Sequence, residues 1–173
     1  DRVFALTRQH VDQMKAQFPL PMSHDEMQMP SMTNMAAPAE VVEQLSGFVA
    51  PYLQLSQALA ADDLDAAKRA VEPLHQRLAS MLPIVSEVKS VEVWSKEKRD
   101  LSEIIARLQK ANDLATLRSG FALLSEQMLS LERMFGLPTD ETLYELHCPM
   151  AFDGRGASWI QSDDAVRNPY YGA

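Results

Sequence analysis

The sequence predicts a mainly α-helical protein: an up-down bundle of four to five helices with a small irregular or two-stranded C-terminal lobe. Only six of the 173 residues are glycine, while alanine, leucine, glutamine and glutamate are plentiful, a composition that favours helix. Apolar residues between 114 and 135 recur at alternating steps of three and four, which is the pattern of a bundle seam. After Pro138 the helical pattern gives way to short extended segments separated by turn residues.

The first two segments of the chain differ in kind. Residues 1–18 are expected to form an N-terminal amphipathic helix, which Pro19 and Pro21 end. Residues 19–38 contain four prolines and five methionines without helical spacing, so we expect a Met/Pro-rich linker. The apolar face of the first helix is irregular, which allows it to join the bundle or to pack on another molecule.

Residues 39–173 are expected to form a single domain that begins with two helices. The helix over 39–63 should kink at Pro51, and the helix over 64–81 should kink at Pro73 and take Asp62 or Asp63 as its N-cap. The expected inward residues of the first are Val42, Leu45, Val49, Tyr52 or Leu53, and Leu59. Those of the second are Ala67, Val71, Leu74, Leu78 and Met81.

Two further helices complete the bundle. Residues 83–95 are predicted to be irregular, and Trp94 is placed at the start of a helix that runs to Ala111. Asp113 is the expected N-cap of the last helix, which Gly136 and Pro138 end. The inward residues of the earlier helix are Leu101, Ile104, Ile105 and Leu108. The seam of the last helix is Leu114, Leu117, Phe121, Leu124, Met128, Leu131 and Phe135.

The C-terminal lobe is expected to contain two short strands and two turns. "ETLYELHCPMAF" and "ASWIQ" have an extended pattern, "DGRG" between them is typical of a turn, and "RNPYYG" predicts an Asn-Pro turn.

The net charge of −8 argues against nucleic acid as a partner, because an acidic surface repels phosphate. No apolar stretch approaches the length of a membrane span, so direct membrane insertion is not expected. No catalytic or nucleotide-binding motif is present. We therefore expect a protein that is not an enzyme, since a nucleophilic role for Cys148 would need a base that no motif supplies.

The segment "LHCPMAF" carries the strongest chemical signal. Thiolate and thioether are soft ligands that select Cu(I) or Ag(I) over hard cations. In an extended chain Cys148 and Met150 would share a face and His147 would point away, whereas a turn at Pro149 would let His147 and Met150 converge. We rank Cys148 and Met150 ahead of His147 as ligands. The alternative is that Cys148 is a small buried apolar group and Met150 fills the core.

The Met/Pro-rich linker is a second candidate metal segment. Its thioethers lack helical spacing, which makes filling of a core a poor explanation. The alternative is a flexible linker that covers the bundle with adaptable side chains. Its possible ligands are Met22, His24, Met27, Met29, Met32 and Met35.

The tail "HCPMAFDGRGASWIQSDDAVRNPYYG" resembles the signature of a bacterial domain of unknown function. That domain occurs at the C-terminus of periplasmic adaptors of heavy-metal efflux pumps of the resistance-nodulation-division class, and as a stand-alone secreted protein. The resemblance covers about residues 40 to 172 and is specific in the tail: Cys148, Pro149, Met150, Gly156, Trp159, Gln161, Asn168, Pro169, Tyr170, Tyr171 and Gly172. It implies a periplasmic helical domain that handles copper or silver. In that family a Met and a Cys-Gly usually follow the Asn-Pro-Tyr turn, so a further ligand, or a disulfide partner for Cys148, is expected beyond Ala173.

These observations lead to two hypotheses. The first is a periplasmic module that binds Cu(I) or Ag(I) and exchanges it with efflux pump or adaptor components. The second is a structural or protein-interaction bundle of an efflux adaptor, without a metal role, in which Trp159, Tyr170 and Tyr171 build a small core with Cys148.

Overall fold

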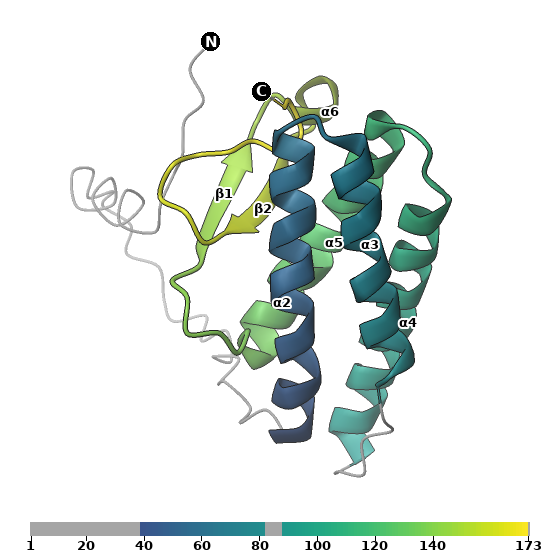
Figure 1. The fold of residues 1–173 in the computed structure, drawn as a ribbon. Coiled ribbons are helices and arrows are strands. Elements are labelled where there is room, and N and C mark those ends of the chain that lie inside the picture. The colour runs from purple at the N-terminus through teal and green to yellow at the C-terminus, as the bar shows by residue number, and fades with distance from the viewer. Residues whose placement is uncertain (1–38, 82–87, 173) are drawn as a thin grey trace, which may run out of the picture.

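A computed structural model describes residues 39–81 and 88–172 and confirms the predicted fold class (Figure 1). Four long helices run up and down beside one another, and a two-stranded sheet packs on one side of the bundle. The predicted helix 1–18 and linker 19–38 lie outside the described residues. Within those residues, no helix has both the length and the apolar character needed to cross a bilayer. The elements in chain order are α2 (Ala39–Ala60), α3 (Leu64–Ala79), α4 (Val88–Lys110), α5 (Leu114–Phe135), β1 (Tyr144–Cys148), α6 (Ala151–Gly154) and β2 (Ala157–Gln161).

The two aspartates between α2 and α3 have different roles. Asp63 is the N-cap of α3, because its Oδ1 accepts a hydrogen bond from the backbone N–H of Ala66 at 2.8 Å. Asp62 adopts a left-handed backbone with φ of 57°, which turns the chain between the helices. Both helices continue through their internal prolines, Pro51 and Pro73.

The buried face of α2 is wider than predicted. Leu45, Val49, Leu59 and both Tyr52 and Leu53 are buried, as expected, but Val42 is only half-buried. Its place is taken by Val41 and by additional residues, Phe48, Leu55 and Ala58. The cause is that α2 contacts α3 on one side and α5 and β2 on another, so a single stripe is not enough. On α3 all five predicted inward residues are buried, although Met81 follows the helix.

The predicted irregular stretch 83–95 is wrong from residue 88 onward, because α4 begins at Val88. Trp94 lies in the second turn of this helix and is 3% exposed, with its ring edge-on to Phe135 at a centroid distance of 6.2 Å. Packing against α5 therefore overrides the weak helical propensity of the valine-containing segment. Further along α4, Leu101, Ile105 and Leu108 are buried and Ile104 is half-buried.

The heptad seam of α5 is confirmed. Its five central residues are buried and its end residues, Leu114 and Phe135, are half-buried. Asp113 caps the first turn by accepting from the N–H of Thr116 at 2.7 Å. Gly136 ends the helix with φ of 74°, a backbone conformation that favours glycine.

The sheet is antiparallel, with Leu146 opposite Trp159 and Cys148 opposite Ala157. Strand β2 packs against α5 and α2, and Trp159 is completely buried. The two predicted strands are therefore confirmed. They form a lobe whose sheet packs one face against the bundle.

The hydroxyl of Tyr52 joins the lobe to the bundle. It accepts a hydrogen bond from the backbone N–H of Ile160 at 2.9 Å and shares a second with Ser125 Oγ at 2.9 Å. The ring stacks on Phe121 with centroids 5.2 Å apart. Burial raises the pKa of Tyr52, so the hydroxyl stays neutral. One side chain of α2 thus satisfies polar groups of β2 and α5 within the core.

We expect Tyr52→Phe to lower the free energy of unfolding by about 2 kcal/mol, because it leaves the Ile160 N–H and the Ser125 hydroxyl buried without this partner. Urea denaturation followed by circular dichroism measures the change. The control Ser125→Ala keeps the Ile160 bond and should cost only about 1 kcal/mol. Equal stability of Tyr52→Phe and the wild type would contradict this role.

Candidate functional site

The candidate metal segment lies where β1 ends. The strand stops at Cys148, and the chain then turns at residues 149–150, where Met150 has αR backbone angles. Pro149 has no N–H to continue the ladder. Cys148 is 2% exposed and Met150 is 65% exposed. The expected shared face of Cys148 and Met150 is therefore wrong, because the extended chain does not continue past the proline.

Cys148 is a core residue. Its thiol is free and belongs to the buried cluster that also contains Ala151, Trp159 and Tyr170. This matches the alternative in which the cysteine serves as a small apolar group. The same alternative placed Met150 in the core, and the interaction hypothesis placed Tyr171 there, but both are exposed.

His147 lies on the outer face of the sheet, as alternation along β1 requires. Its Nδ1 is 2.9 Å from Ser158 Oγ, the side chain directly opposite on β2. In the tautomer that donates from Nδ1 to Ser158, Nε2 carries the lone pair that a metal ion needs. The ring lies over Gly156, where an added Cβ would be 2.8 Å from both Cε1 and Nε2.

Met150 is the most exposed large apolar side chain among the described residues. Its backbone carbonyl accepts a hydrogen bond from the hydroxyl of Tyr171 at 3.0 Å, so the turn is tied to the chain 21 residues further on. Its thioether is accessible for a ligand, unlike the Cys148 thiol.

An aromatic cluster supports this turn from inside. The Tyr170 hydroxyl donates to the carbonyl of Ser158 at 2.7 Å, and burial raises the pKa of that hydroxyl, which keeps it a neutral donor. Its ring contacts Phe121, Phe152 and Trp159 at centroid distances of 5.9, 5.5 and 5.9 Å. Tyr170 and Trp159 are thus core residues of the lobe, as the interaction hypothesis expected.

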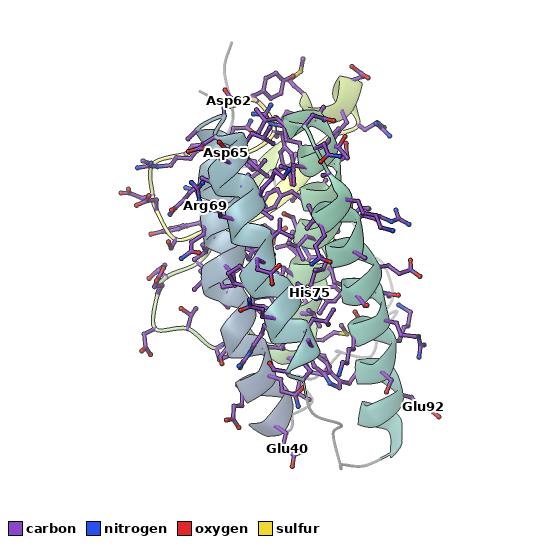
Figure 2. All side chains as sticks on the ribbon, turned by 45° about the vertical axis from the view of Figure 1, so that its right-hand side comes forward. Glu40, Asp62, Asp65, Arg69, His75 and Glu92 are labelled. Atoms are coloured by element: carbon purple, nitrogen blue, oxygen red, sulfur yellow. The ribbon has the colours of Figure 1, made fainter. Side chains whose placement is uncertain are left out.

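Sequence reasoning missed Arg118, which anchors the predicted Asn-Pro turn. Its guanidinium donates to the carbonyl of Pro169 at 2.9 Å, to the carbonyl of Leu59 at 3.0 Å and to Asp62 Oδ1 at 2.5 Å. Figure 2 shows Asp62 at the end of the bundle where α6 lies, with Glu40 and Glu92 at the opposite end. No local spacing indicates this residue, because its partners lie in distant parts of the chain.

Nowhere in residues 39–81 and 88–172 do three or more His, Cys, Asp or Glu side chains gather as a metal cluster. Outside the tail, His75 is exposed on α3 (Figure 2). The lower-ranked ligands Met22, His24, Met27, Met29, Met32 and Met35 lie outside the described residues.

Comparison with known proteins gives one match. The family model described as "Protein of unknown function (DUF3347)" matches residues 48–140, more than half of the chain. The matched region runs from α2 to the end of the bundle and stops before β1. No curated protein matches, and no solved structure matches.

We expect the Cys148 thiol to react with a disulfide reagent at least about a hundredfold more slowly in the native protein than in urea, because the reagent cannot reach a buried sulfur. The absorbance of the released thiolate measures both rates. Similar rates would show that the lobe opens readily and would restore Cys148 as an accessible ligand.

Gly156→Ala should displace the His147 imidazole and destabilise the fold by about 1 to 2 kcal/mol, since φ is +78° and the new Cβ meets the ring. Gly154→Ala is the matched control, because Gly154 has φ of +83° but open space around it. Imidazole NMR signals of His147 should move only in Gly156→Ala. Equal movement in both variants would contradict the contact.

Proposed function

We propose that this chain, which belongs to the family of proteins of unknown function DUF3347, is a periplasmic module that binds Cu(I) or Ag(I) in connection with heavy-metal efflux. The family name assigns no activity, so the proposal rests on the chain's own side chains and on the resemblance of its tail. The observation that carries the proposal is the exposed Met150 thioether, three residues after the exposed His147 on the C-terminal lobe. The role is binding and transfer of an ion, not catalysis.

The chemistry of these two side chains favours a soft ion. A thioether has no proton to lose and is a poor ligand for Mg²⁺ or Ca²⁺, whereas Cu(I) accepts thioether and imidazole. Ser158 beside Nδ1 gives His147 the outer-sphere partner that metal-bound histidines usually have. Two ligands suffice for Cu(I), although they fall short of the four that structural zinc takes.

The Met/Pro-rich linker supplies further donors in this proposal. Its thioethers would capture the ion and exchange it with the lobe, and a transfer role suits a site with few ligands. Cys148 is not assigned to the exposed site, because its burial places the thiol in the core.

The location and the partners rest on the tail motif. The resemblance of residues 147–172 to the domain of efflux adaptors supports a periplasmic location, with efflux pump or adaptor components as partners. The net charge of −8 agrees with a cation as cargo and with a partner other than nucleic acid.

The second candidate function is a protein-interaction bundle without a metal role. The buried Cys148 favours it, because the most distinctive residue of the tail then acts in packing. In this case the exposed apolar residues Met150, Tyr171 and Val166 would contact an adaptor or pump.

Anaerobic Cu(I) titration against a competing chelator tests the metal proposal. His147→Ala with Met150→Leu should weaken lobe binding at least about tenfold, because both donors are removed. Leucine at Met22, Met27, Met29, Met32 and Met35 should lower the number of ions bound per chain. Cys148→Ser should change stability more than affinity.

Met134→Leu is the control, since it replaces a half-buried thioether of α5. Equal affinity and stoichiometry in all these variants would contradict the metal proposal and leave the interaction bundle as the better account.

A further inference from the structure

Two adjacent tyrosines near the C-terminus face opposite ways. Tyr170 is 8% exposed and lies in the aromatic cluster, whereas Tyr171 is 58% exposed. A packing role accounts for Tyr170 but not for Tyr171, whose ring is largely in solvent. The polar contact of Tyr171 is the hydrogen bond from its hydroxyl to the carbonyl of Met150.

The backbone that carries Tyr171 is held from several directions. The Tyr170 N–H donates to Asn168 Oδ1 at 2.9 Å, and the Gly172 N–H donates to the Asn168 carbonyl at 3.2 Å. Arg118 of α5 holds the Pro169 carbonyl. Tyr171 therefore projects from a turn that is fixed to the bundle, and its hydroxyl reaches a turn that is not part of the bundle.

The local hydrogen bonds of the receiving turn involve residues after Met150: the Gly156 N–H donates to the Ala151 carbonyl at 3.0 Å, and Arg155 Nε donates to the Phe152 carbonyl at 3.0 Å. Met150 is the N-cap residue before the short element α6 and makes no side-chain cap hydrogen bond, and Phe152 and Asp153 after it have left-handed backbone angles, φ of 53° and 59°. Such angles are unfavourable for residues other than glycine and need support from the surroundings. The bond from Tyr171 restrains the backbone of the residue that carries the exposed thioether.

We propose that Tyr171 is a positioning residue for Met150, which holds the thioether-bearing turn in the conformation that binds a soft metal ion. This inference rests on the proposed metal function. An ion that binds a mobile ligand must also order it, and a turn that is already fixed avoids that loss of affinity. Tyr171 itself does not contact the ion in this account.

Tyr171→Phe tests this role, because it keeps the ring and removes only the hydroxyl. The background is the full chain with leucine at the five linker methionines, so that the lobe is observed alone. Ag(I) nitrate in chloride-free buffer is the probe, and the methyl signal of isotope-labelled Met150 reports binding. Tyr144→Phe, on the half-buried tyrosine of β1, is the matched control.

We expect Tyr171→Phe to bind Ag(I) roughly three- to tenfold more weakly, the fold-change that corresponds to one neutral hydrogen bond. Without metal, the Met150 backbone amide should become more mobile in NMR relaxation, while the melting temperature stays close to that of the background protein. Tyr144→Phe should change neither affinity nor mobility. A merely structural Tyr171 would lower the melting temperature and leave the affinity of the folded protein unchanged.

Two other outcomes separate this inference from the proposed function. If the background protein binds Ag(I) through Met150 and Tyr171→Phe binds equally well, the positioning role is wrong and the metal function stands. If the Met150 methyl signal does not respond to Ag(I) in the background protein, the metal function of the lobe is wrong, and the inference falls with it.

Discussion

The hydrogen bond between the Ile160 N–H and the Tyr52 hydroxyl is the contact on which the arrangement of the lobe depends. A strand that packs its face on helices buries backbone groups that its single partner strand cannot satisfy, and each such group needs a bonding partner. Tyr52 of α2 supplies that partner, and the same hydroxyl makes a second hydrogen bond with Ser125 of α5. The bond therefore ties β2 to both helices, while the apolar side chains of Leu146, Cys148 and Trp159 set which face of the sheet is inside.

The division of roles in the tail follows from this docking. With the inner face fixed, alternation along β1 places Leu146 and Cys148 in the core and His147 outside. The turn at residues 149–150 then brings Met150 to the surface instead of back to the core. A cysteine and a methionine separated by one proline thus have different surroundings: one stabilises the lobe, and the other is available to a ligand. Arg118 of α5 holds the Asn-Pro turn through its hydrogen bond to the Pro169 carbonyl.

Much of the bundle could be predicted from the sequence because its signals are local. Asp113, Gly136 and the seam of α5 lie within one helix, and the strands β1 and β2 are bounded by turn residues. The start of α4, the half-buried Val42 and the separation of Cys148 from Met150 could not be predicted, because each depends on packing between elements. The same holds for the hydrogen bonds of Tyr52 to Ile160 and of Arg118 to Pro169, which join residues 108 and 51 positions apart. The tail motif also did not indicate which of its residues are buried in the core.

Native-state hydrogen exchange of the Ile160 amide tests the anchoring of the lobe most directly. If Tyr52 holds β2 on the bundle, this amide exchanges only when the domain unfolds, with the same opening free energy as the amides at the centre of α5, such as Leu124. An Ile160 amide that exchanges within about tenfold of the rate of an unstructured peptide, while Leu124 stays protected, would contradict the account, because the lobe would then open independently of the bundle.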